Sequence, residues 1–239
     1  MLSTIALYTL VPLAAALLSG GIAAVRAPGP RLTSGLQHFA AGVVFAATAI
    51  ELIPAVLERS PWVAVAGFAA GIAVMFTFRH VGARIERGRA ARGALGVPVG
   101  LIVATGIDFL VDGVILGAGF STEARVGVLL TVALAVEYLF VGLSISASIA
   151  GTLPTFVVAL LPAVLAVLTI GGALGGAVLL GGASPALLAG VLAFGAVAFM
   201  YLATEELLVE AHESGETSVG SVGFFVGFLV YLVLSELLS

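Results

Sequence analysis

The chain has 239 residues, of which 61% are hydrophobic and only 9% are charged, with a formal net charge of −4 at pH 7. A soluble domain has roughly 25% charged residues, so this chain lacks the polar groups needed to cover a surface in water. The composition excludes a soluble globular protein, and a single short arginine cluster is too small to form a nucleic-acid-binding face. The absence of cysteine excludes disulfides and thiolate metal ligands.

Apolar segments of helix length follow one another along the chain, bounded by charged residues, prolines or glycine clusters. Each has about the 20 residues that a membrane-spanning helix needs. The first segment lacks the basic start of a secretory signal peptide, so we count it as a span. The segments cover residues 2–25, 35–57, 62–79, 95–120, 126–150, 155–180, 185–210 and 220–238. We therefore expect an all-α polytopic membrane protein with about eight transmembrane helices in one domain, residues 1–239.

Arginine sets the expected orientation, because the chain has no lysine. Two arginines lie between the first two segments and five between the third and fourth, and these connections fall on the same side of the membrane. The positive-inside rule puts that side in the cytoplasm, with Arg59 and Arg125 outside. Both termini are then extracytoplasmic. The chain divides into three helices (1–79), a cytoplasmic basic loop (80–94), two central helices (95–150) and three final helices (151–239).

A weak internal repeat relates the second and seventh segments. An offset of 155 positions lays Phe39 on Phe194, Glu51 on Glu206 and Glu58 on Glu213. The second segment runs outward and the seventh inward under the orientation above. An inverted repeat of this kind is a recurring transporter architecture with a binding site near the midplane. We predict a 3+2+3 arrangement around the two central helices.

Three acidic residues lie near the middle of the two central segments. Asp108 and Asp112 are four positions apart, which puts both carboxylates on one helix face, and Glu137 lies near the middle of the next segment. An ionisable group in the hydrocarbon core costs several kcal/mol and is a functional candidate by default. Three such carboxylates need a cation, a shared proton or water between them. Oxygen ligands suit hard or borderline divalent cations. The structural alternative for Glu137 is a protonated side chain that bonds a neighbouring helix.

Further ionisable residues lie at other depths along a predicted cation path. Glu51 lies in the outer part of the second segment, and His38 lies near its inner end. The inner end of the seventh segment holds a second group of pathway candidates: Glu205, Glu206, Glu210, His212 and Glu213. For Glu210, His212 and Glu213, together with Glu216, the alternative interpretation is a solvated helix end. The order from outside to inside is Glu51, the three central carboxylates, and then this group.

Glycines recur at small-xxx-small spacing on two segments, at Gly113 and Gly117 and within residues 171–176. This spacing favours close helix packing over ligand binding.

The sequence resembles ZIP-type divalent metal transporters over nearly its whole length. The similar stretches are HFAAGVVFAATAIELIPAVLE (38–58), FLVDGVILGAGF (109–120) and AVAFMYLATEELLVEAHE (196–213), together with the basic loop. The resemblance implies eight helices with both termini outside. It also implies metal binding on the fourth and fifth helices, where ZIP proteins carry His-Asn-x-x-Asp/Glu-Gly and His-Glu-x-Pro-His-Glu.

This chain departs from those motifs. Asp112 and Gly113 fit the first motif, but Asp108 stands in place of the histidine and Phe109 in place of the asparagine. In the second motif only Glu137 can act as a ligand, and the sixth segment has glycines where some members have a glutamate. The resemblance therefore implies one metal site of Asp108, Asp112 and Glu137, in place of a two-metal centre.

The function expected from the sequence is secondary transport of a divalent cation across the plasma membrane of a prokaryote. The cation, with Zn²⁺, Mn²⁺, Fe²⁺, Co²⁺ and Cd²⁺ as candidates, is the cargo; we expect no cofactor, no enzymatic activity and no nucleic-acid partner. Small-residue helix faces permit a homodimer. The alternatives are a proton-linked transporter of another solute, a degenerate non-transporting member of the family, and an intramembrane hydrolase. The last is disfavoured because both aspartates lie on one helix.

Overall fold

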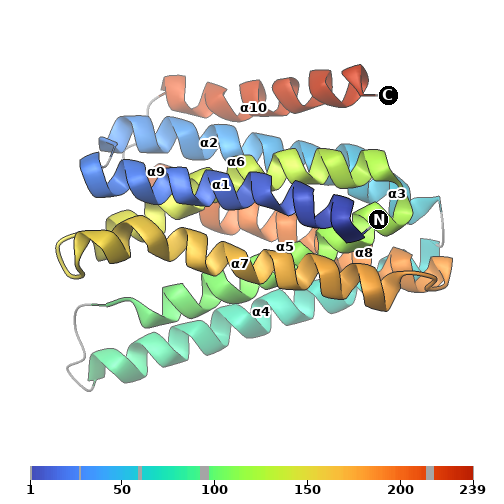
Figure 1. Cartoon of the computed structure of the whole chain (residues 1–239), viewed down its shortest axis with the longest axis horizontal. Helices are drawn as coiled ribbons and strands as arrows, with labels where there is room; N and C mark the ends of the chain where they lie inside the picture. Colours follow the sequence, from blue (N-terminus) through green and yellow to red (C-terminus); the bar gives the residue numbers. More distant parts are fainter. Residues whose placement is uncertain (1, 27, 59–60, 92–96, 214–217, 239) are drawn as a thin grey trace.

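Helices account for nearly all of the chain in the computed structural model, which describes residues 2–26, 28–58, 61–91, 97–213 and 218–238 (Figure 1). Two of the helices contain an internal π-helical segment, labelled η1 and η2. The elements in chain order are α1 (Leu2–Arg26), α2 (Pro30–Ala47), η1 (Thr48–Leu52), α3 (Ile53–Leu57), α4 (Pro61–Ala91), α5 (Val99–Thr122), α6 (Ala124–Ile149), α7 (Thr155–Leu180), α8 (Pro185–Tyr201), η2 (Leu202–Leu207), α9 (Leu208–Glu213) and α10 (Ser218–Leu237).

Seven helices in the described part of the chain are long and apolar enough to cross a membrane: Leu2–Arg26, Pro30–Leu57, Val99–Thr122, Ala124–Ile149, Thr155–Leu180, Pro185–Glu213 and Gly220–Leu237. The predicted third segment corresponds to a shorter apolar stretch, Pro61–Thr77, at the start of α4. Large apolar side chains on these helices are exposed, among them Leu7, Leu179 and Phe225. A bundle with such an outer surface buries it in lipid. The prediction of a polytopic, all-helical membrane protein is confirmed.

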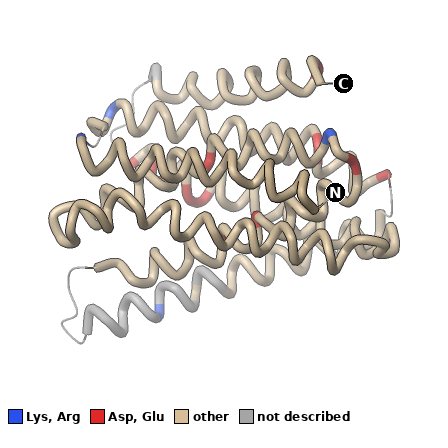
Figure 2. Tube along the Cα trace, in the orientation of Figure 1, with Lys and Arg blue, Asp and Glu red and all other residues tan. Residues whose placement is uncertain are grey.

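Consecutive long helices run in opposite directions, and both ends of the described chain lie at the same end of the bundle (Figure 1). The opposite end carries the α1–α2 connection with Arg26 and Arg31. Acidic residues lie at the end that holds the termini and also within the bundle (Figure 2). We call the end with Arg26 and Arg31 the basic end and the other the terminal end.

The basic connection predicted over residues 80–94 is not a loop along most of its length. Helix α4 continues through it to Ala91, and residues 92–96 lie outside the described part of the chain. The sequence ARIERGRAA explains the difference, because alanine, arginine and glutamate have high helix propensity. Helix α4 therefore extends well beyond its apolar stretch.

Some pairs of helices in the bundle contact each other much more extensively than others. The most extensive contacts are those of α5 with α7, α2 with α10, α4 with α8, and α1 with both α6 and α7. Helices α4 and α10 lie at opposite edges of the bundle (Figure 1). The centre is formed by α2, α5, α6 and α8, each of which contacts at least two of the others. The acidic residues of the central segments therefore lie where several helices meet.

Glycines allow α5 and α7, the pair with the most extensive contact, to approach backbone to backbone. A methyl group added at Gly113 would overlap the carbonyl oxygen of Thr169, and one added at Gly172 would overlap that of Leu110. Small residues let membrane helices approach in this way. The prediction that glycines serve close helix contact is confirmed at both positions. Gly171, in contrast, has nothing within 4 Å of the place that an added methyl group would take, so it lies outside the contact.

Each of the two π-helical segments interrupts one long helix. Segment η1 contains Glu51 and is followed by Pro54, which has no amide hydrogen for a regular helical bond. Segment η2 contains Glu205 and Glu206 and has no proline. Single π turns within α-helices are often found at functional sites. Both segments here carry ionisable residues: Glu51 of η1 is buried, whereas Glu205 and Glu206 of η2 are exposed.

Candidate metal centre

The structure brings Asp108, Asp112 and Glu137 together. Each offers a carboxylate oxygen, and these oxygens lie within 4.8 Å of one another. Asp108 and Asp112 share one face of α5 because they are one helical turn apart, and Glu137 approaches from α6, which packs against α5. We call these three residues the carboxylate cluster. Among the described residues it is the group of histidine and acidic side chains close enough to hold one metal ion.

The cluster is buried most deeply at Glu137. The Glu137 side chain is 0% exposed, and neither of its carboxylate oxygens has a hydrogen-bond donor in the described part of the chain. Asp112 is its close neighbour, but two carboxylates can bond each other only by sharing a proton. Asp112 is 1% exposed, whereas Asp108 is partly exposed. A buried carboxylate without a donor is costly, because its charge has lost water and gained nothing in return. A bound cation would offset this cost.

Asp112 is held in place by side chains that the sequence alone does not indicate. The hydroxyl of Tyr138 donates to Oδ2 of Asp112 at 3.2 Å, and it lies 2.6 Å from the hydroxyl of Thr169 on α7. The tyrosine ring stacks on Phe109 with ring centroids 3.7 Å apart. Thr169 is also the residue that Gly113 approaches. The close contact of α5 with α7 therefore fixes the orientation of one carboxylate of the cluster.

Glu206 lies nearer to the cluster than its sequence position indicates. It interacts electrostatically with Asp108, Asp112 and Glu137, although its own side chain is exposed. Glu206 in turn interacts with Glu210, which lies one helical turn further toward the basic end. Acidic groups thus extend from the buried cluster to the exposed Glu206 on η2 and the half-buried Glu210 on α9. Glu205, the neighbouring pathway candidate, is exposed as well.

The other pathway candidates near the basic end form contacts between helices. The hydroxyl of Ser144 on α6 donates to Oε1 of Glu210. The rings of His38 and His212 lie side by side with centroids 5.3 Å apart. His38 is buried and His212 is exposed. The structure thus joins residues of α2, α6 and α9 that are far apart in the sequence.

Glu51 does not lie in the carboxylate cluster but in a separate polar contact near the terminal end. Ser235 of α10 donates its hydroxyl to Oε1 of Glu51 at 2.7 Å, and Nη1 of Arg125 lies 3.5 Å from Oε2. Arg125 also donates through Nη2 to the carbonyl oxygen and the hydroxyl of Ser235, at 2.8 and 2.9 Å. We call Glu51, Arg125 and Ser235 the polar latch. It ties η1, α6 and α10 together.

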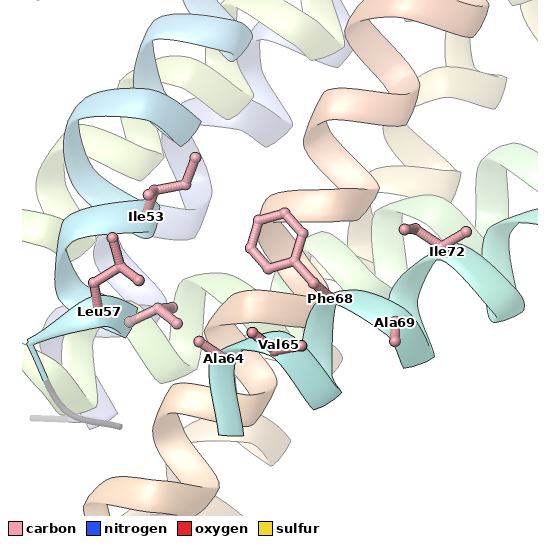
Figure 3. Close-up of a pocket in the computed structure, with 8 residues that line it drawn as sticks. Ile53, Leu57, Ala64, Val65, Phe68, Ala69 and Ile72 are labelled. Carbon is pink, nitrogen blue, oxygen red and sulfur yellow. The ribbon is translucent and has the colours of Figure 1, made fainter. Parts of the chain in front are cut away.

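One pocket on the bundle has a lining that cannot bind an ion. It has a volume of about 430 Å³ and lies between α3 and α4 (Figure 3). Its lining is apolar and includes Ile53, Leu57, Phe68 and Ile72. These side chains offer neither oxygen nor nitrogen ligands, so the pocket cannot bind a metal cation.

No protein-family model matches the chain, and a search of curated proteins finds no significant match. The resemblance to ZIP-type transporters therefore rests on the motif residues themselves. The function has to be argued from the geometry of the carboxylate cluster and its surroundings.

Proposed function

We propose that this protein carries a divalent cation across the membrane and that the carboxylate cluster is its binding site. The observation that carries the proposal is Glu137, a fully buried carboxylate with no hydrogen-bond donor among the described residues, beside two further carboxylates. Three like charges at this separation in a medium of low dielectric constant repel one another strongly. A divalent cation removes the repulsion and supplies the missing partner of Glu137.

The chemistry of the cluster favours a cation that accepts oxygen ligands. Carboxylates with water suit Mn²⁺, Fe²⁺ and Co²⁺, while Zn²⁺ and Cd²⁺ also bind oxygen but usually take nitrogen or sulfur where these are offered. A transport site must bind weakly enough to release its cargo. Three carboxylates, one of them partly exposed, meet that need better than a closed structural site. The cation is cargo and not a resident cofactor.

An inverted 3+2+3 repeat, as in ZIP-type transporters, is part of this proposal. In it α4 supplies an eighth span, and the first three spans correspond to the last three. The observed helix contacts support this correspondence, because exchanging the two halves turns the α2–α10 contact into the α8–α4 contact, and α5–α7 into α6–α1. The π segments support it further: an offset of 155 lays Glu51 of η1 on Glu206 of η2.

The arginine distribution supports an orientation with the basic end in the cytoplasm and both termini outside. Under the repeat, Glu51 and Glu206 are counterparts on the outer and inner sides. They differ in this structure, since Glu51 is buried in the polar latch whereas Glu206 is exposed and within electrostatic range of the cluster. We propose that this is an inward-facing state and that the latch closes the outer side. Opening the outer side would exchange the two arrangements, as alternating access requires.

Thermal stabilisation of the purified protein by metal ions tests the binding site. The Asp108→Asn/Asp112→Asn variant is compared with wild type across Mg²⁺, Mn²⁺, Fe²⁺, Co²⁺, Zn²⁺ and Cd²⁺. We expect one or more ions to stabilise the wild type, with the effect lost in the variant. The control is Glu123→Gln, which removes an exposed carboxylate at the α5–α6 connection.

Two results would count against the proposal. Equal stabilisation of wild type and the double variant would place the metal elsewhere. No stabilisation by any ion would favour the alternative in which the cluster carries protons for another solute, and proton flux in vesicles would then be the next measurement.

A further inference from the structure

A second group of polar side chains lies at the basic end, apart from the carboxylate cluster. On the first turns of α2, the hydroxyl of Ser34 and Nε2 of His38 have no hydrogen-bond partner in the described part of the chain. Gln37 lies between them and approaches Glu210, but its amide atoms form no hydrogen bond of regular geometry with a described residue. All three side chains of α2 are at most 2% exposed. Unpaired buried polar atoms are rare because each costs about 1–3 kcal/mol. Their concentration within two turns of one helix points to a ligand.

His38 is oriented as a metal ligand. Its Nδ1 lies 2.8 Å from the carbonyl oxygen of Ser34, so Nδ1 carries the proton and donates it. Nε2 then has a lone pair that no described residue uses. A histidine whose other ring nitrogen bonds a backbone carbonyl has its tautomer and direction fixed, which is the usual arrangement for metal-binding histidines.

His212 on α9 lies next to His38 and is fixed in the same way. Its Nδ1 donates to the carbonyl oxygen of Leu208, one turn back on the helix. The two ring centroids are 5.3 Å apart, with an angle of 50° between the ring planes. Two imidazoles at this separation lie close enough to share one cation, with water completing the coordination. Imidazole suits Zn²⁺, Co²⁺ and Ni²⁺, whereas Mn²⁺ prefers oxygen.

Glu210 connects this pair to the carboxylate cluster. It interacts with Glu206 on one side and with Gln37, the neighbour of His38, on the other. Ser144 donates a hydrogen bond to it. A cation that leaves the cluster through Glu206 therefore meets Glu210 next and the two histidines after it.

We propose that His38 and His212 form a second cation site at the basic end, selective for divalent ions that accept nitrogen ligands. Its place on the transport path rests on the proposed function, whereas its ability to bind metal does not. The two sites differ in ligand type. The carboxylate cluster offers oxygen alone, and the histidine site offers nitrogen.

The test is the number of metal ions bound by the full-length, tag-free protein in detergent, measured by equilibrium dialysis with Zn²⁺ and with Mn²⁺. We expect His38→Ala to lose one Zn²⁺ or to bind it about tenfold more weakly, with Mn²⁺ binding unchanged. Because His38 is buried, His212→Ala at an exposed position makes the same measurement without altering the core. The matched control is His80→Ala, since His80 makes the same kind of bond, from Nδ1 to the carbonyl oxygen of Phe76, but is exposed on α4.

Asp112→Asn separates this proposal from the proposed function. If Asp112→Asn retains the Zn²⁺ that depends on His38, the two sites are independent. If Asp112→Asn changes nothing while His38→Ala abolishes binding, the histidine site stands without the carboxylate site. The visible spectrum of bound Co²⁺ gives a second readout, because loss of imidazole changes it. Equal Zn²⁺ binding by wild type, His38→Ala and His212→Ala would overturn the proposal.

Discussion

The two single substitutions that break the polar latch should lower the free energy of unfolding by different amounts, depending on which charged side chain remains. Arg125→Gln leaves Glu51, whose side chain is 2% exposed, without its counter-charge. Removing one partner of a buried ion pair costs about 3 kcal/mol at the lower end of the usual range, which applies here because the Ser235 hydroxyl still donates to Glu51. Glu51→Gln leaves an arginine that is 31% exposed and can reach water. This change should cost about 1 kcal/mol.

The coupling between the two charges follows from their separation. At 3.5 Å the Coulomb energy of the pair is about 5 kcal/mol for an effective dielectric constant of about 20. Solvent screening at the partly exposed arginine reduces this to about 2 kcal/mol. The double variant should therefore cost about 2 kcal/mol, less than Arg125→Gln alone.

Reversible unfolding in mixed micelles, followed by far-UV circular dichroism, gives the three free energies. The exposed Glu123→Gln serves as the control for loss of a charge. If Arg125→Gln and Glu51→Gln cost the same and their effects add in the double variant, the latch does not hold a buried charge and the reasoning is wrong.

Three further predictions concern the cluster and its supports. Gly113→Ala should destabilise the protein by about 2 kcal/mol in the same unfolding assay, because the added methyl group overlaps α7. The control Gly171→Ala should have little effect, because nothing lies within 4 Å of its added methyl group. Tyr138→Phe should weaken metal binding about fivefold in dialysis without unfolding the protein, because Asp112 loses the hydrogen bond that orients it. Glu206→Gln should slow metal uptake by proteoliposomes more than it weakens binding, since we propose that Glu206 lies on the path by which the cation leaves the cluster. An equal loss of uptake and of binding would instead make Glu206 a ligand.

The local sequence pattern is enough to predict the helices and part of the carboxylate cluster. Apolar segment length predicts the spans, and the spacing of Asp108 and Asp112 by one turn predicts that they share a face. Glu137 can be assigned to the same depth because a membrane fixes the height of each span. These inferences need only helix geometry and the thickness of the bilayer.

The contacts between distant helices cannot be predicted in the same way. Tyr138 and Thr169 support Asp112 because α5 and α7 approach at glycines, and the sequence period of either helix does not determine how the two cross. The contact of His38 with His212 joins residues on α2 and α9 that have no local relation. Sequence position puts Glu206 at a helix end, but η2 adds a wide turn there, and a π turn changes the direction of the residues around it.

The partners of a charged residue cannot be predicted from its sequence position either, as Arg125 shows. Its position after the fourth apolar segment predicts only a residue on the outer side of the membrane. Its partners, Glu51 and Ser235, come from η1 and α10. The signal in the sequence is an arginine at the start of one apolar helix and a glutamate within another, which is compatible with many pairings.

Metal uptake by proteoliposomes containing the Glu137→Gln variant tests the central claim most directly. Glutamine keeps the size of the side chain and removes the charge that we propose the cargo neutralises. The account predicts that uptake of the cation found to stabilise the wild type is lost in Glu137→Gln and kept in Glu123→Gln, with both variants folded. Uptake by Glu137→Gln at the wild-type rate would contradict it.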